Sequence, residues 1–104
     1  MVMRKPTSVV PPLTDAVRVR LRLYVSGNAP NSVRAIDNAK ALCAGHFDAR
    51  CDLEIIDLLE EPLRALADGI IVTPTLIRVL PLPVQRVVGN LSDTSQVLLA
   101  LAEA

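Results

Sequence analysis

The chain has 104 residues, 51% of them hydrophobic, and a mean hydropathy of +0.40, so we expect one globular domain with a modest core. Eleven basic residues balance eleven acidic ones, and Tyr24 and Phe47 are the only aromatic residues. Nucleic-acid-binding proteins generally need a positive field or aromatic stacking surfaces, so this class is disfavoured. No apolar run approaches the roughly 18 residues of a membrane span, and no signal peptide is recognisable. We expect a cytoplasmic protein without a membrane partner.

The first 16 residues are rich in proline and show no hydrophobic periodicity. We interpret residues 1–16 as a flexible leader and residues 17–104 as the folded domain. From Val17 to Val25 apolar residues alternate with three arginines and Tyr24, which predicts a strand with one buried face. The arginines are expected to lie on a solvated face, with a binding surface as the alternative.

Pro30 suits the first turn of a helix, and an apolar stripe follows at helical spacing: Val33, Ile36, Ala39 or Lys40, Leu42 and Cys43. Gly45 is expected to end this helix in a left-handed conformation. A second strand lies between Asp52 and Asp57, parallel to the first if the helix is a crossover. A short helix is predicted from Pro62 to about Ala67.

Two short strands are predicted at Thr75–Val79 and Val84–Val88, joined by a proline-containing hairpin connection. Ser92 or Asp93 then caps a final helix, whose apolar stripe is Val97, Leu98, Leu101 and Ala104. The predicted order is βαβαββα in a single α/β domain. This order matches the minimal thioredoxin-like fold, in which Pro74 occupies the position of a proline that is commonly cis.

The cysteines of thioredoxin-like oxidoreductases lie between the first strand and the first helix, where the helix N-terminus lowers the thiol pKa. Here that position, residues 27–32, contains no cysteine. We interpret Cys43 and Cys51 as buried free thiols and His46 as an exposed loop residue, and we expect no metal site, no cofactor and no catalytic residues. An enzyme is therefore disfavoured.

Five motifs along the chain are distinctive: Leu23-Tyr24-Val25-Ser26-Gly27-Asn28-Ala29-Pro30-Asn31-Ser32-Val33-Arg34-Ala35, Ile56-Asp57-Leu58-Leu59, Thr73-Pro74-Thr75-Leu76, Leu80-Pro81-Leu82-Pro83-Val84 and Gly89-Asn90-Leu91-Ser92-Asp93. Together they resemble the KaiB family of cyanobacterial circadian-clock proteins. The resemblance covers about Val17 to the C-terminus, and residues 27–34 form its most specific block.

The resemblance implies a non-enzymatic adaptor that binds the ATPase ring of a hexameric KaiC-like protein and helps to sequester a KaiA-like protein. It also implies two folds: a tetrameric ground state and a monomeric thioredoxin-like state that binds the ring. Pro74, Pro81 and Pro83 match family prolines in the region that changes structure. Arg34 and Arg86 match basic positions used against the ring, with solvated surface arginines as the alternative interpretation, whereas two other commonly basic positions are Glu54 and Gly69 here.

Ala100 and Ala102 stand where family members often carry glycine and aspartate. Glycine costs about 0.8–1.0 kcal/mol relative to alanine within a helix, so both alanines favour a terminal helix. We therefore expect the thioredoxin-like monomer as the resting state, with the tetrameric ground state as the alternative. Two alternative functions stay open: a thioredoxin-fold redox or chaperone-like protein using Cys43 and Cys51, and a sensor domain of a histidine kinase. The second is less expected because no kinase segment follows Ala104.

Overall fold

The computed structural model describes residues 19–47 and 51–102. The predicted leader at residues 1–16 and the end of the predicted final stripe at Ala104 lie outside the described residues. The elements follow the predicted order: β1 (Val19–Val25), α2 (Pro30–Leu42), η2 (Cys43–Phe47), β2 (Cys51–Asp57), α3 (Pro62–Ala67), β3 (Thr75–Leu80), β4 (Gln85–Val88) and α4 (Thr94–Ala102). None of the helices described is long and apolar enough to cross a membrane.

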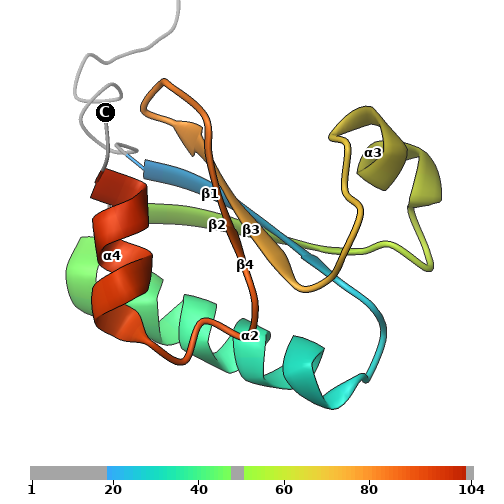
Figure 1. Cartoon of the computed structure of the whole chain (residues 1–104), viewed down its shortest axis with the longest axis horizontal. Helices are drawn as coiled ribbons and strands as arrows, with labels where there is room; N and C mark the ends of the chain where they lie inside the picture. Colours follow the sequence, from blue (N-terminus) through green and yellow to red (C-terminus); the bar gives the residue numbers. More distant parts are fainter. Residues whose placement is uncertain (1–18, 48–50, 103–104) are drawn as a thin grey trace, which may run out of the picture.

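The four strands form one mixed sheet in the order β2-β1-β3-β4. β1 and β2 are parallel, as predicted for a helical crossover, and Arg20 and Arg22 lie directly opposite Asp52 and Glu54. β3 is antiparallel to both β1 and β4. In Figure 1, α2 and α4 lie on one side of the sheet, while α3 lies at its other end on the opposite side.

The larger core cluster lies between the sheet and the two longer helices. Leu21, Leu23 and Val25 of β1 project into it, because alternate residues of a strand share a face. Their partners come from β3, α2, α4 and the segment before α4: Leu76, Ala35, Ala39, Leu42, Val97, Leu101 and Leu91. The predicted core face of β1 is therefore confirmed for residues 21–25.

The opposite face of the sheet carries a second, smaller core. Tyr24, Ile56 and Ile77 are buried there against Ala65 of α3. The prediction that this face of β1 is solvated is wrong at its carboxyl end, because Tyr24 is fully buried and Arg22 is half-buried. α3 covers the face here. The residue pattern of β1 alone does not indicate that a helix about 40 residues later in the chain will cover it.

α2 begins at Pro30 as predicted, but its buried stripe differs from the predicted one. Ser32 is buried whereas Val33 is 44% exposed. The Ser32 hydroxyl accepts a hydrogen bond from the Ser26 backbone N–H at 3.0 Å, and this contact satisfies the buried oxygen. Gly45 does not end the helix in a left-handed conformation. The chain continues through it as the π-helical segment η2.

The second half of the chain follows the predicted order with small shifts at the strand ends. β3 extends to Leu80 and β4 begins only at Gln85. Asp93 caps α4, because its Oδ1 accepts a hydrogen bond from the Gln96 N–H at 3.1 Å. The peptide bonds before Pro74, Pro81 and Pro83 are all cis.

Candidate partner-binding surface

The two predicted contact arginines lie on opposite sides of the sheet. Arg86 is exposed on β4, and its guanidinium donates hydrogen bonds to the backbone carbonyls of Asp68 and Gly69 just after α3, the latter at 3.3 Å. Arg34 is exposed on α2 and lies 3.4 Å from the Asn31 Oδ1. The structure therefore does not bring Arg34 and Arg86 into one site.

Arg86 borders an apolar surface that the sequence analysis missed. Ile71, Val72 and Val88 line an open hollow of about 320 Å³ together with Arg86. Ile71 is 93% exposed, and Leu63 and Leu66 on the neighbouring α3 are each at least three-quarters exposed. We call these side chains the α3 surface: Leu63, Leu66, Ile71, Val72 and Val88. Exposed apolar groups gathered in one region commonly mark an interaction site.

A sequence signal for this surface exists in the run from Ile70 to Val72. These three consecutive apolar residues follow a glycine and precede the next strand, and they belong to neither a helical nor an alternating pattern. Only the half-buried Ile70 packs against the small core, so Ile71 and Val72 are left exposed to solvent. This apolar run outside any predicted helix or strand is thus the sequence feature that could have indicated the α3 surface.

A polar network beneath this surface joins α3 to the sheet. Oδ2 of Asp68 lies 2.5 Å from the Tyr24 hydroxyl and 2.9 Å from a terminal nitrogen of Arg22. Burial alone would raise the pKa of Asp68, but the hydrogen bonds from Tyr24 and Arg22 lower it below its usual value. Burial and the bond to Asp68 raise the pKa of Tyr24 to about 12. The network holds the carboxyl end of α3 in place.

Glu54 extends this network on the outer side. Its two carboxylate oxygens accept hydrogen bonds from Arg64 of α3 at 2.7 and 2.9 Å, and Oε1 lies 3.5 Å from Arg22. The hydrogen bonds with Arg64 lower the pKa of Glu54 and raise that of Arg64. The acidic residue at this position, where the family resemblance leads one to expect a basic one, is therefore engaged within the molecule. Gly69, the second such position, adopts a φ of 68° that favours glycine.

The candidate switch and fold-bias residues lie apart from the α3 surface or at its edge. Pro74 is buried at the start of β3, whereas Pro81 and Pro83 are exposed in the β3–β4 connection. Ala100 is half-buried in α4. Ala102 is the last residue of that helix, and its side chain lies outside the described part of the structure.

Cys43 and Cys51 form a disulfide with a Cα–Cα separation of 5.5 Å. The prediction of two buried free thiols is therefore wrong. Both residues are half-buried; Cys43 directly follows α2, and Cys51 is the first residue of β2. His46 is exposed, as predicted, but it lies in η2 and not in a loop. Within residues 19–47 and 51–102, no three His, Cys, Asp or Glu residues cluster as metal ligands do.

The family model described as "KaiB domain" matches residues 22–102. The chain belongs to the KaiB family. It is 47% identical over 87 residues to the circadian clock protein KaiB3 of Synechocystis sp., covering 84% of this chain and 85% of the relative. It is 49% identical over 81 residues to the circadian clock oscillator protein KaiB of Synechococcus elongatus, covering 78% and 79%. KaiB membership confirms the resemblance and supports the expectation of a non-enzymatic protein.

Solved structures show the fold of this KaiB-family chain to be thioredoxin-like. The solution structure of the N-terminal domain of Synechococcus elongatus SasA matches with a TM-score of 0.65 at 23% identity, covering 95% of this chain and 90% of that domain. A malarial protein matches with the same TM-score at 15% identity, covering 82% and 99%. At these identities the likeness concerns the fold alone, and it confirms the predicted βαβαββα arrangement.

Proposed function

We propose that this KaiB-family protein is a non-enzymatic cytoplasmic adaptor that binds the ATPase ring of a KaiC-like hexamer in circadian, timing or stress regulation. The observation that carries this proposal is the α3 surface beside Arg86. It offers apolar area for a partner to cover and a positive charge at its edge. Relatives named as circadian clock proteins support the regulatory setting.

The α3 surface supplies affinity and Arg86 supplies orientation. Burying apolar area stabilises a complex by about 25 cal/mol per Å², and a basic group at the rim of a contact steers it toward an acidic partner. Arg86 is held by the backbone carbonyls after α3, so its position and that of the apolar side chains are coupled. Arg34, on the other side of the sheet, would make a separate contact, either with the ring or with a KaiA-like protein.

We propose further that the thioredoxin-like monomer is the resting state. α4 is formed through Ala100 and Ala102, where alanine stabilises a helix better than glycine or aspartate. A KaiC-like partner would then meet a surface that is already formed. The tetrameric ground state, with a change of fold around Pro74, Pro81 and Pro83, is the competing arrangement.

The test measures the affinity for a purified KaiC-like hexamer by biolayer interferometry, comparing the wild type with Ile71→Asp and Arg86→Ala. Because Ile71 is almost fully exposed, aspartate there leaves the core intact while placing a charge in the contact. We expect Ile71→Asp to weaken binding at least tenfold. Leu99→Asp is the matched control, since Leu99 is also exposed and apolar but lies on α4.

Equal affinities for the wild type and Ile71→Asp would contradict the assignment of the α3 surface. Failure of the wild type to bind any KaiC-like hexamer would contradict the adaptor function itself.

The alternative function is redox or chaperone-like activity through Cys43 and Cys51. The disulfide gives it a specific observation, but the bridge lies at the carboxyl end of α2 and not at the N-terminus where a helix activates a thiol. An insulin-reduction assay distinguishes it: activity lost in Cys43→Ser would favour the redox function over the adaptor.

A further inference from the structure

The Cys43–Cys51 disulfide joins two elements that both support the larger core. Cys43 is the first residue of η2 and Cys51 is the first residue of β2. Their Cα separation of 5.5 Å lies in the commonest range for disulfides. The sequence contains only these two cysteines, so the pairing has no intramolecular competitor. Both residues are half-buried, which leaves the bridge within reach of a small thiol.

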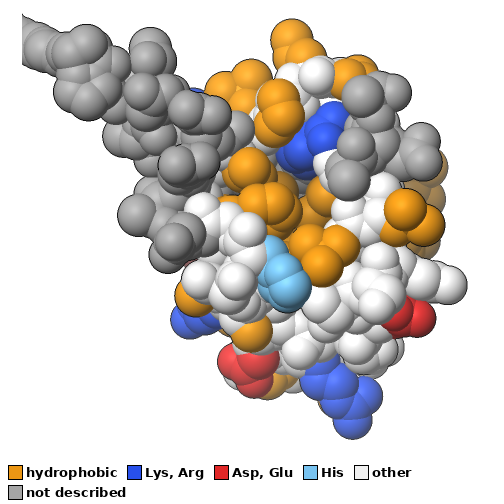
Figure 2. All heavy atoms as spheres, turned by 90° about the vertical axis from the view of Figure 1, so that its left-hand side faces the viewer, with side chains coloured by type: hydrophobic (Ala, Val, Ile, Leu, Met, Phe, Trp, Pro, Cys, Tyr) orange, Lys and Arg blue, Asp and Glu red, His pale blue; other side chains and the backbone are white. Residues whose placement is uncertain are grey.

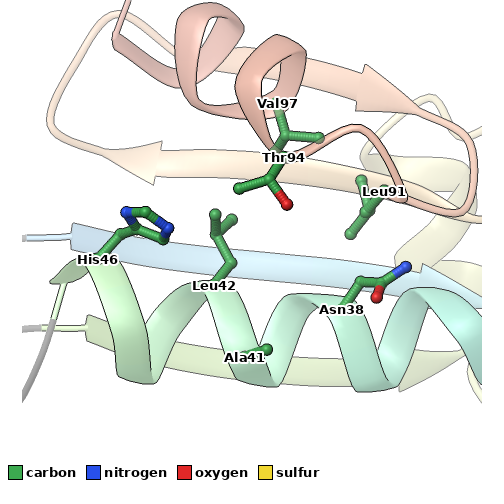
Figure 3. A pocket seen from close by; sticks show the side chains of 7 residues that line it. All are labelled: Asn38, Ala41, Leu42, His46, Leu91, Thr94 and Val97. Atoms are coloured by element: carbon green, nitrogen blue, oxygen red, sulfur yellow. The ribbon is translucent and has the colours of Figure 1, made fainter.

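The carboxyl-terminal part of α2 and His46 of η2 form one wall of a hollow whose other wall belongs to the α4 region. His46 and Leu42 point from η2 and the end of α2 toward Thr94 and Val97, as Figure 3 shows. Leu91, which precedes α4, completes the apolar lining of this hollow of about 100 Å³. The side chains on the two walls thus come from segments about 50 residues apart in sequence.

A second hollow lies between Phe47, at the end of η2, and α4. Phe47 lines this open hollow of about 380 Å³ with Leu98 and Leu101, and hydrophobic side chains gather around a depression on this side of the molecule (Figure 2). Phe47, Cys51 and Leu98 all pack against the larger core cluster. His46 and Phe47 of η2 therefore each line a hollow that is also lined by residues of α4.

α4 depends on packing against other elements because it has only nine residues. Isolated helices shorter than about 12–15 residues are marginal in water, so a short helix owes its stability to tertiary packing. Its carboxyl end is held by Arg78, which donates a hydrogen bond to the Leu101 carbonyl, and its N-terminus is capped by Asp93. The middle of the helix relies on contacts with β4 and with the larger core, and it shares two hollows with His46 and Phe47 of η2.

We propose that the Cys43–Cys51 pair is a redox-sensitive clamp that controls how firmly α4 is held. Oxidation removes two electrons and two protons from the two thiols, forms the S–S bond and converts a low-molecular-weight disulfide such as oxidised glutathione into two thiols. A dithiol reverses the step. In the reduced protein η2 loses its covalent tie to β2, and His46 and Phe47 are no longer fixed against α4.

The effect is local because β1 and β2 remain paired over seven residues without the bridge. The clamp goes beyond the proposed adaptor function and does not depend on it, since it concerns the mobility of α4 in the free protein. Two observations support the proposed clamp: the disulfide joins η2 to β2, and residues of η2 and α4 line the same two hollows.

The test is hydrogen exchange by NMR on the full chain, equilibrated with oxidised glutathione or with excess dithiothreitol. We expect reduction to speed exchange of the Val97 and Leu101 amides at least tenfold relative to that of Leu23 in β1. The Cys43→Ser/Cys51→Ser variant should not respond to dithiothreitol and should match the reduced wild type. Phe47→Ala should give fast α4 exchange in the oxidised protein and a smaller response to reduction.

Two results would overturn the clamp. One is an α4 amide exchange that does not change on reduction, or that changes by the same factor as Leu23. The other is recovery of two alkylatable thiols per chain, by mass spectrometry, after equilibration with oxidised glutathione. Neither result bears on binding to a KaiC-like ring, so the two proposals fail separately.

Discussion

The hydroxyl of Tyr24, on β1, lies 2.5 Å from Oδ2 of Asp68, just after α3. This contact links the central strand to the short helix that carries part of the α3 surface. Tyr24 is fully buried, so its hydroxyl would lack solvent as an alternative partner. The orientation of α3 is thus coupled to the interior of the sheet.

Tyr24→Phe is expected to lower the free energy of unfolding by about 1 kcal/mol, because it removes this hydrogen bond while Arg22 still pairs with Asp68. Urea denaturation followed by circular dichroism measures the change. Asp52→Asn is the control: it breaks the exposed pair with Arg20 and should cost less than about 0.5 kcal/mol. Equal costs for the two variants would argue against a special role for the buried contact.

Tyr24 is the only tyrosine, so the absorbance of tyrosinate reports on this residue alone. We expect its ionisation in the folded protein near pH 12, whereas in urea it should occur near pH 10. Since the folded-state pKa is the higher one, Tyr24 stabilises the fold fully below about pH 10, and that stabilisation is lost as the pH rises toward 12. Asp68→Asn should lower the folded-state midpoint. A midpoint near 10 in the folded wild type would contradict the burial of the phenol.

Asp68 and Glu54 have pKa values that are lower in the folded protein than their usual values. Each therefore stabilises the fold above the unfolded-state pKa of about 4, and the stabilisation is lost as the pH falls through the lower folded-state value. Urea denaturation between pH 2 and pH 6 should show stability decreasing toward acid. The slope should be shallower in Asp68→Asn, and an unchanged slope would contradict the assigned pairing.

Arg78 is buried on β3 and connects it to two carbonyl groups, that of Leu101 in α4 and that of Pro83 at 2.6 Å. Arg78→Lys keeps the positive charge but has one nitrogen in place of a planar fork. We expect a loss of about 1–3 kcal/mol in unfolding free energy, measured with urea. Arg20→Lys, an exposed conservative change, should have little effect. Comparable small effects for both would show that a single ammonium replaces the guanidinium.

Ala100→Gly tests the preference for the thioredoxin-like monomer. Glycine within α4 should cost about 1 kcal/mol and move the population toward the competing tetramer, measured by light scattering together with backbone chemical shifts of residues 70–102. Ala41→Gly makes the same change in α2 and should lower stability without altering the mass. If the Ala100→Gly protein stays monomeric and keeps the β3–β4 hairpin, the helix propensity of α4 does not determine which fold the chain prefers.

The order of the elements could be predicted because each has a local signal. Pro30 and Pro62 mark helix starts, Asp93 marks a cap, and alternation marks β1. These signals depend on neighbouring residues, and they do not state which other element covers a given face. The face of β1 that carries the arginines was accordingly expected to be solvated, although α3 covers Tyr24 on that same face.

The candidate site was harder to predict for the same reason. Arg86 was identified through the family resemblance, but its apolar neighbours Ile71 and Val88 come together only when the chain folds. The Cys43–Cys51 pair was missed because a sequence separation of 8 does not fix the Cα distance. The segment from Cys43 to Phe47 is π-helical, and this irregular geometry has no simple periodic signal in the sequence.

β2 lies at one border of the sheet described here, with β1 as its neighbour. A border strand exposes backbone donors and acceptors that can pair with another chain. Asp52 and Glu54 are exposed along it, and each pairs with an arginine on β1 of the same molecule. Two such borders brought together would place carboxylates against carboxylates. The carboxylates that pair with arginines across β1 and β2 therefore also oppose the joining of sheets between copies.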